Sequence, residues 1–266
     1  MHIFLSMLAA AILPQKNPTL SYPSHIDSLE VSAVTVPVND TTNVTVFEAA
    51  DREWWSKQNT DDLISGQNKD SVYGLKLWPG AVGSISVLSS LAATRDSQSL
   101  AGLTVLELGC GNGCASIAAA QLGAAQVIAT DISEQALRFT EIAARSAGFD
   151  SNRFHCQPFD VCGSCPLPDA DIVLVSDLLY ESTLARSVAR RVVEADARDS
   201  CIIVSGDPAR AARGDFLETL QQTSQKSTGE GWHFFGPSFS VRLDALKWKS
   251  KRVETAIWNQ DFEARL

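Results

Sequence analysis

A glycine-rich loop with acidic residues on both sides is the part of this sequence best suited to hold a ligand. The segment Thr104–Gly113 reads TVLELGCGNG and places Gly109, Gly111 and Gly113 after an apolar run. Glycine lets the chain turn sharply and lets a ligand approach the backbone where a Cβ would collide. The next apolar run, QVIATD, ends at Asp131, where a carboxylate can accept both hydroxyl groups of a ribose. We therefore expect a nucleotide or nucleoside ligand.

Glu107 separates the ligand classes that this loop can bind. A dinucleotide fingerprint needs Gly-x-Gly-x-x-Gly/Ala, but the sixth position is Cys114 counted from Gly109 and Ser116 counted from Gly111. Glu107 lies two residues before the first glycine, where it would repel a pyrophosphate and attract the sulfonium or ammonium group of S-adenosylmethionine. At ~4 Å and an effective dielectric of about 20, such a charge pair is worth about 4 kcal/mol before desolvation. Glu107 thus favours a cationic ligand, the alternative being an acid that only caps or solvates the loop.

Strands and helices alternate around this loop. We expect apolar strands at residues 104–108, 126–131, 153–160, 170–177 and 201–207. Helices are expected from about residue 112, then at 133–148, with Ser133 as N-cap and Gly148 past the end, at 181–195 and at 209–222. This order is typical of a parallel sheet covered by helices on both faces. Residues 233–241 and 245–258 predict a closing antiparallel pair.

The predicted fold class is therefore α/β: a doubly wound, Rossmann-like, mostly parallel seven-strand sheet with an antiparallel C-terminal hairpin and a small N-terminal extension of a β-hairpin and a helix. Residues 1–30 lack periodicity, and we expect them to be poorly ordered. Valines alternate on both sides of a polar NDTTN turn within residues 33–49 and predict the hairpin. A polar loop or short helix follows at 51–70, and Trp78-Pro79 predicts the start of a helix that runs to about Leu91. The extension covers residues 31–98 and the ligand-binding domain residues 99–266.

Composition excludes several classes of partner and site. The net charge of −9 argues against sequence-independent nucleic-acid binding, which depends on Lys and Arg at phosphates. No apolar run approaches the ~20 residues that a membrane span needs. The first fifteen residues lack the basic start of a signal peptide, so we expect a cytoplasmic protein with six reduced cysteines. Cys162 and Cys165 have metal-ligand spacing, but no second pair accompanies them, and we expect no metal.

Several motifs together resemble a known family. ELGCGNG, the strand end at Asp131, Phe159-Asp160 and SDLLY at 176–180 resemble the seven-strand S-adenosylmethionine-dependent methyltransferases. LWPGA at 77–81, SDLLY and GDPAR at 206–210 resemble, more narrowly, the family-16 group of protein lysine methyltransferases. That group includes the electron-transfer flavoprotein β-subunit lysine methyltransferase and non-histone lysine methyltransferases. The resemblance covers roughly residues 70 to 220.

The resemblance implies a cofactor site for S-adenosylmethionine. Gly109, Cys110 and Gly111 would contact the amino-acid part of the cofactor, and Asp131 would bind its ribose. Phe159 and Asp160 would flank the adenine, unless Phe159 is an ordinary core residue. The complete set of cofactor-binding residues that we expect is Trp78, Glu107, Gly109, Cys110, Gly111, Gly113, Asp131, Phe159, Asp160 and Ser176.

The SDLLY segment carries the expected catalytic residues. Ser176 begins the loop, and Asp177 and Tyr180 would face the transfer site. A lysine arrives protonated, with an ordinary pKa of about 10.4, so the site must favour the neutral amine or accept its proton. Asp177 would hold the amine and Tyr180 would orient it. The alternative for Asp177 is a cap of the following helix.

The resemblance favours methyl transfer to a protein lysine, so the expected partner is a protein substrate. A small-molecule amine is a second possible acceptor, because only SDLLY separates the two. A nucleotide-dependent oxidoreductase or a catalytically silent interaction module on the same sheet is the third hypothesis. Enzymes that methylate nucleic-acid bases usually have a [DNS]-P-P-[YFW] motif in place of SDLLY, and this sequence lacks it. The sequence does not indicate an oligomeric state.

Overall fold

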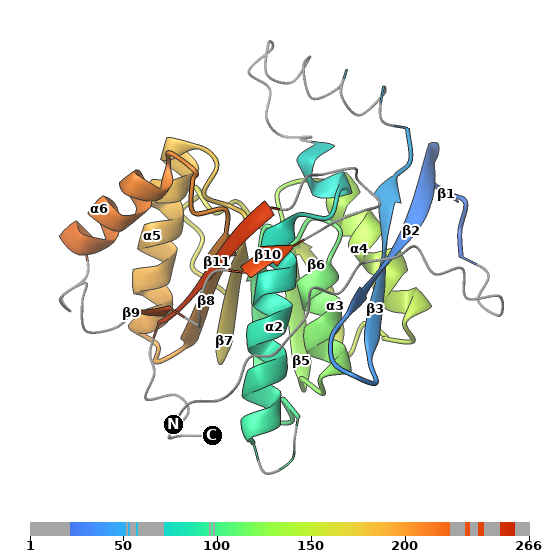
Figure 1. Ribbon diagram of the computed structural model, residues 1–266, viewed down its shortest axis with the longest axis horizontal. Coiled ribbons are helices and arrows are strands. Elements are labelled where there is room, and N and C mark those ends of the chain that lie inside the picture. The colour runs from blue at the N-terminus through green and yellow to red at the C-terminus, as the bar shows by residue number, and fades with distance from the viewer. Residues whose placement is uncertain are drawn as a thin grey trace.

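A mixed β-sheet forms the centre of the molecule (Figure 1). The computed structural model describes residues 22–51, 53, 57, 72–95, 97, 99–223, 232–234, 239–241 and 251–258. Five strands pair in parallel in the order β8-β7-β4-β5-β6: β4 (Thr104–Leu108), β5 (Gln126–Asp131), β6 (Phe154–Pro158), β7 (Ile172–Ser176) and β8 (Cys201–Gly206). Strand β11 (Lys251–Trp258) pairs antiparallel with β8.

Two short strands complete the far edge of the sheet. β9 (Trp232–Phe234) and β10 (Phe239–Val241) pair antiparallel with opposite ends of β11, so together they fill one strand position. In the described part of the chain the sheet thus has eight strands in seven positions, which confirms a mostly parallel sheet closed by an antiparallel C-terminal strand. The single strand predicted at residues 233–241 is two short strands, β9 and β10.

Helices cover both faces of the sheet, as a doubly wound fold requires (Figure 1). Buried strand residues such as Val105 and Ile172 share one apolar cluster with α2 (Pro79–Thr94), α3 (Cys114–Gln121) and α4 (Glu134–Ser146). Their neighbours Leu106 and Val173 share the other cluster with α5 (Ser182–Asp196) and α6 (Arg213–Thr223). The division follows the period of two along each strand, because successive side chains point to opposite faces.

A second, three-stranded sheet lies outside α3 and α4 (Figure 1). It consists of β1 (His25–Ile26), β2 (Leu29–Pro37) and β3 (Asn43–Ala49), and it confirms the predicted hairpin by pairing Val34 with Val46 and Val36 with Val44. Strand β1 and the start of β2 fall within the segment 1–30 that the sequence predicts to be irregular. Residues 1–21 and nearly all of 51–70 lie outside the described residues.

Polar contacts from β3 hold the segment that leads into α2. This segment contains the short 3-10 helix η1 (Val72–Leu75). The buried carboxylate of Glu48 accepts a hydrogen bond from the N–H of Leu77, and the buried Lys76 ammonium donates to the carbonyl of Ala49. Burying charged groups is tolerated only when hydrogen bonds compensate them. These contacts fix the chain immediately before Trp78.

The ends of α4 and α5 are capped by their own sequences. Ser133 is the N-cap of α4 and accepts a hydrogen bond from the N–H of Ala136, and Gly148 follows the helix with a φ of 88°, both as predicted. Glu181 caps α5 by accepting hydrogen bonds from two backbone N–H groups at 2.9 Å. The alternative of Asp177 as the cap of α5 is therefore wrong. No helix in the described part of the chain is long and apolar enough to cross a membrane.

Candidate functional site

The site lies where the chain order of the sheet reverses. From β4 the chain adds β5 and β6 on one side, then returns to add β7 and β8 on the other side. Ligands of open α/β sheets bind at such a switch point, outside the carboxyl ends of the strands. The glycine loop follows β4 and the SDLLY loop follows β7, so both border this crevice.

The three glycines of the loop have a conformation that other residues rarely adopt. Gly109, Gly111 and Gly113 have φ values of 64°, 55° and 78°. A Cβ on Gly109 would lie 2.5 Å from Leu178, and one on Gly111 would lie 3.3 Å from the carbonyl oxygen of Gly74. The sequence predicts glycine here because a ligand approaches the backbone, but the positive φ and the packing against the protein itself already require it.

Asp131 joins the glycine loop to the start of α4. Its Oδ2 accepts from the N–H of Gly111 and its Oδ1 from the N–H of Ser133, both at 2.9 Å. Burial raises the pKa of Asp131, and these hydrogen bonds oppose the shift. Each carboxylate oxygen has a second lone pair that can accept from a ligand. Asp131 thus lies at the end of β5 with its carboxylate oriented and with acceptor capacity left.

Glu107 is buried and its carboxylate turns toward the start of α3. Its Oε2 accepts from the backbone N–H of Ser116 at 2.9 Å and also from the Ser116 hydroxyl. Burial raises the pKa of Glu107 to about 7, although hydrogen bonds from Ser116 and Ser176 oppose the shift. The capping alternative for Glu107 therefore describes part of its role. The sequence argument assumes that Glu107 is fully negative when it attracts a cation. With a pKa of about 7, Glu107 is only partly ionised at neutral pH.

The residues after β6 continue the crevice beyond Asp131. The N–H of Phe159 donates to the carbonyl of Asp131 at 3.0 Å, so the two residues are neighbours at adjacent strand ends. Phe159 is buried, and the guanidinium of Arg191 lies 5.1 Å from its ring centroid. Phe159 is thus a core residue on that side. Asp160 is exposed, and its Oδ1 accepts from the N–H of Cys162 at 2.8 Å in a turn.

Cys110 in the glycine loop and Ser176 at the end of β7 both make hydrogen bonds within the protein. Cys110 is buried, its N–H donates to the carbonyl of Thr130 at 2.8 Å, and burial raises the pKa of its thiol. The hydroxyl of Ser176, at the end of β7, lies 2.9 Å from that of Ser84 on α2. Both residues therefore contribute weakly polar groups near the ends of β4 and β7.

Three aromatic side chains gather beside the glycine loop. The ring of Tyr73 lies 5.9 Å from that of Trp78 and 5.8 Å from that of Tyr180 between centroids, and we call these three residues the aromatic group. Burial raises the pKa of Tyr180 to about 12, with a contribution from the charge of Asp131. Trp78 donates from Nε1 to the carbonyl of Tyr73 at 2.8 Å, which fixes its ring. The aromatic group therefore brings η1 and the SDLLY loop together.

Asp177 has a contact that the sequence does not predict. Its Oδ2 accepts a hydrogen bond from the N–H of Gly80 in the first turn of α2, and its own φ is 57°. Burial raises its pKa, whereas hydrogen bonds from the N–H groups of Gly80 and Asp207 and the charge of Arg210 lower it. The carboxylate is thus already held by two backbone donors. It stabilises the start of α2, next to Trp78.

Part of the predicted set lies together at the switch point, and two further residues contact it. The glycine loop is bonded to Asp131 and the charge of Asp131 acts on Tyr180, whereas Asp177 faces the start of α2. Tyr73 was not among the predicted residues, although it lies only five positions before Trp78. Leu178, which packs against Gly109, is the second addition. Neither residue stands out in the sequence, because an isolated Tyr or Leu has no local signature of a site.

Part of the chain is similar to methyltransferases of a ribosomal protein. It is 40% identical over 83 residues to the ribosomal protein L11 methyltransferase of Azotobacter vinelandii, covering 31% of this chain and 27% of that protein. It is 42% identical over 84 residues to the corresponding protein of Pseudomonas paraeruginosa, covering 32% of this chain and 27% of that protein. The matched region thus spans about a quarter of the length of these relatives.

Solved structures of methyltransferases are similar at low sequence identity. The magnesium protoporphyrin IX methyltransferase of Synechocystis PCC 6803 with bound S-adenosylhomocysteine is 19% identical with a TM-score of 0.49, covering 78% of this chain and 97% of that chain. The ribosomal protein L11 methylase of Lactobacillus delbrueckii subsp. bulgaricus is 20% identical with a TM-score of 0.43, covering 67% and 79%.

A family model decides the assignment. The model described as lysine methyltransferase matches residues 57–223, which is more than half of the 266 residues. The match includes the glycine loop, the end of β5 and the SDLLY loop. The chain therefore belongs to the lysine methyltransferase family and is an S-adenosylmethionine-dependent methyltransferase.

Proposed function

We propose that this enzyme transfers the methyl group of S-adenosylmethionine to the side-chain nitrogen of a lysine in a protein substrate. The observation that carries the proposal is the aromatic group beside the glycine loop. Aromatic faces attract ammonium groups and also pack against aliphatic chains, and a lysine side chain offers both. The ribosomal protein L11 methyltransferases that match part of the chain also support a protein acceptor.

The residues around the switch point fit the cofactor. Asp131 would hold the ribose hydroxyls, because both its oxygens keep acceptor capacity at the end of β5. Gly109, Cys110, Gly111 and Gly113 would lie along the amino-acid part, and Phe159 and Asp160 would lie near the adenine, as in the family that the chain resembles. When bound, S-adenosylmethionine supplies a methyl group on a positively charged sulfur. Trp78 and Ser176 would close the crevice from the α2 side.

Tyr180 is the residue that we propose to contact the lysine nitrogen. With a pKa of about 12, its hydroxyl remains protonated at neutral pH and cannot serve as the base that removes the lysine proton. It can orient the nitrogen by hydrogen bonding and by its ring face. Methyl transfer demands mainly positioning of a neutral nucleophile in line with the bond that breaks. The lysine ammonium would therefore lose its proton to solvent, which reaches this place because 39% of Tyr180 is exposed, before the neutral amine accepts the methyl group.

Asp177, in this proposal, acts by holding neighbouring residues of the site in position. Its carboxylate is held by the N–H groups of Gly80 and Asp207, so it has fewer lone pairs to offer an amine than the sequence suggests. By fixing the start of α2 it holds Trp78 against Tyr73. We therefore propose a positioning role for Asp177 in place of direct contact with the amine.

The test is to locate the transferred methyl group. The purified chain is incubated with tritiated S-adenosylmethionine and a cell extract, and the extract is separated into protein and small-molecule fractions. Label in protein that mass spectrometry assigns to lysine supports the proposal. Label confined to the small-molecule fraction would show a small amine as the acceptor. Binding of adenosylhomocysteine without label in either fraction would show a catalytically silent module.

A further inference from the structure

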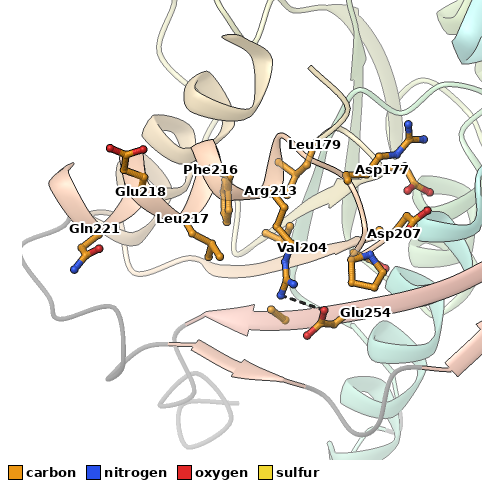
Figure 2. Close-up of a pocket in the computed structure, with 15 residues that line it drawn as sticks. Asp177, Leu179, Val204, Asp207, Arg213, Phe216, Leu217, Glu218, Gln221 and Glu254 are labelled. Carbon is orange, nitrogen blue, oxygen red and sulfur yellow. Dashed lines mark ion pairs between the residues drawn. The ribbon is translucent and has the colours of Figure 1, made fainter. Parts of the chain in front are cut away.

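A pocket of about 640 Å³ lies next to the site, between the end of β8, α6 and β11. Figure 2 shows Asp177 and Asp207 at one end and Glu218 and Gln221 at the other, with Leu217 between them. The pocket does not include the glycine loop or Asp131. It is therefore a separate hollow, and the family assignment gives it no role.

The SDLLY loop lies between this pocket and the glycine loop. Asp177 and Leu179 line the pocket. Leu178 instead packs against Gly109, and Tyr180 lies against Tyr73. Successive residues of this loop thus contact different sides, Asp177 and Leu179 the pocket, and Leu178 and Tyr180 the residues around the glycine loop. An occupant of the pocket would lie one loop away from the residue that we propose to contact the acceptor nitrogen.

The lining of the pocket combines apolar surface with an excess of negative charge. Its apolar members are Leu179, Val204, Pro208, Phe216, Leu217 and Ala256. Leu217 is 42% exposed, and it adjoins the other apolar members of the lining. The charged members of the lining are four acids and two arginines, namely Asp177, Asp207, Glu218, Glu254, Arg210 and Arg213. Arg213 is paired with Glu254 at 3.1 Å. The net charge of the lining is thus −2, of the same sign as the net charge of −9 of the whole chain.

We propose that this pocket, the α6 pocket, binds an apolar side chain of the methyl-accepting protein that is flanked by a Lys or Arg. The proposal rests on the proposed function and specifies its substrate class. The apolar side chain would cover Leu217, whose exposure would otherwise cost hydrophobic free energy. The basic neighbour would meet the acidic rim that includes Glu218, because opposite charges across an interface select partners.

The geometry also sets the spacing between the two substrate residues. The acceptor lysine and the apolar residue would lie on opposite sides of a single loop, so they would be close in space. An extended peptide advances ~3.3 Å per residue, so four residues span roughly 13 Å. The preference should therefore appear at one position within roughly four residues of the lysine.

The test uses synthetic peptides and does not require the natural substrate. Eleven-residue peptides carry a central lysine in an alanine background, with Leu or Phe moved through positions −4 to +4 and an adjacent Arg, or an adjacent Glu as the charge control. Binding to the chain loaded with adenosylhomocysteine is measured by fluorescence anisotropy. The peptides with Leu or Phe plus Arg at one position should bind at least about fivefold more tightly than the same peptides with Ala in place of Leu or Phe, or with Glu in place of Arg.

Three variants assign this preference to the pocket. Leu217→Arg should weaken the preferred peptide at least about fivefold, and Glu218→Lys should shift the preference from the Arg peptide to the Glu peptide. Thr223→Arg is the matched control, since Thr223 is exposed on the same helix, does not line the pocket and donates its hydroxyl to the carbonyl of Thr219 in that helix. Unchanged adenosylhomocysteine affinity in all three shows that the cofactor site is intact. Absence of a positional preference, or an equal effect of Leu217→Arg and Thr223→Arg, would overturn the proposal.

A methylation reaction with the same peptides separates the two proposals. Preferred binding that depends on Leu217, together with labelled lysine, supports both. The same binding without any labelled lysine, in peptides or in extract protein, contradicts the proposed function and keeps the pocket as a peptide site. Labelled lysine without a positional preference contradicts the α6 pocket alone.

Discussion

The carboxylate of Asp177 accepts a hydrogen bond from the backbone N–H of Gly80, 97 residues earlier in the chain. One residue of the SDLLY loop therefore caps the helix that begins beside Trp78. Helix starts leave N–H groups without partners, and an acid at this position stabilises them and the positive end of the helix dipole. The same contact fixes one wall of the site.

Substitutions at Asp177 distinguish positioning from direct catalysis. Asp177→Asn should keep kcat within about fivefold, because an amide oxygen still accepts from Gly80, one neutral hydrogen bond being worth about 1 kcal/mol. Asp177→Ala should lower kcat at least tenfold, since hydrogen bonds to a charged group are worth about 1.5–3 kcal/mol. Both are measured with a labelled lysine acceptor at saturating cofactor.

A third variant at the same position controls for the backbone. Asp177 has a φ of 57°, which Asn tolerates but Ala does not, whereas Gly adopts it freely. Asp177→Gly should therefore lose as much activity as Asp177→Ala. Full activity of Asp177→Gly would show that the loss of activity in Asp177→Ala comes from backbone strain. Equal losses of activity in Asp177→Asn and Asp177→Ala would favour direct contact of the carboxylate with the amine.

The stability of the protein should depend on pH through Glu107. Its carboxyl pKa is raised from 4.5 to about 7, so the native state retains a proton that the unfolded chain releases between these values. The free energy of unfolding therefore loses about 3 kcal/mol from this group as the pH rises from below 4.5 to above 7. Urea unfolding of the wild type and of Glu107→Gln measures this contribution of Glu107 to the free energy of unfolding. The variant should gain relative to the wild type between pH 5 and pH 8, and an equal difference at both would contradict the shift.

Glu107 should also influence which form of the cofactor binds more tightly. S-adenosylmethionine carries a positive sulfur and adenosylhomocysteine a neutral one, so a negative Glu107 favours the former. The pKa of Glu107 is about 7, so Glu107 becomes more negative between pH 6 and pH 8. The affinity for S-adenosylmethionine relative to that for adenosylhomocysteine should therefore increase over this range in the wild type and stay constant in Glu107→Gln. Calorimetry with each ligand at both pH values checks this. A parallel increase in the variant would assign the effect to another group.

Asp131 should dominate cofactor affinity. Asp131→Asn replaces a carboxylate that would accept from two ribose hydroxyls, and charge-assisted hydrogen bonds of this kind are worth about 1.5–3 kcal/mol each. We expect adenosylhomocysteine to bind roughly 10- to 100-fold more weakly, measured by calorimetry. Asp150→Asn is the matched control, because Asp150 also accepts from a backbone N–H two residues on, at 3.0 Å, but lies in an exposed turn. Equal affinities of the two variants would remove Asp131 from the site.

The ring of Tyr180 should matter more to acceptor binding than its hydroxyl. Tyr180→Leu removes the aromatic face that lies 5.8 Å from Tyr73, and a cation–π contact is worth about 1–2 kcal/mol when partly desolvated. We expect KM for a lysine acceptor to rise roughly 5- to 30-fold in Tyr180→Leu. Tyr180→Phe should change KM little and lower kcat. A normal KM in Tyr180→Leu would exclude the aromatic group from the acceptor site.

Local patterns in the sequence predict most of the fold. Alternating valines define the hairpin, Ser133 and Gly148 mark the ends of α4, and apolar strands separated by helices define the parallel sheet. Each of these features depends on residues that lie close together in the chain. The cofactor loop belongs to the same class, because its glycines respond to a local backbone conformation.

The site is predicted less completely, because its decisive contacts join distant segments. Tyr73 meets Tyr180, and Asp177 meets Gly80, across about a hundred residues. Glu107 looks like a ligand-facing charge in the sequence, and only the position of Ser116 at the start of α3 shows why its carboxylate turns inward. No periodicity or spacing encodes these contacts.

The three-stranded sheet affects where the protein can be truncated. The stretch that matches the family begins at residue 57, yet Val46 and Phe47 of β3 are completely enclosed against the helices of the catalytic half. A recombinant fragment trimmed to residues 57–223 would strip that cover from α3 and α4 and remove β11 from beside β8. Such a fragment would expose apolar surface on α3 and α4 and an unpaired edge on β8, so we expect it to aggregate. Recombinant proteins should therefore include β2, β3 and β11.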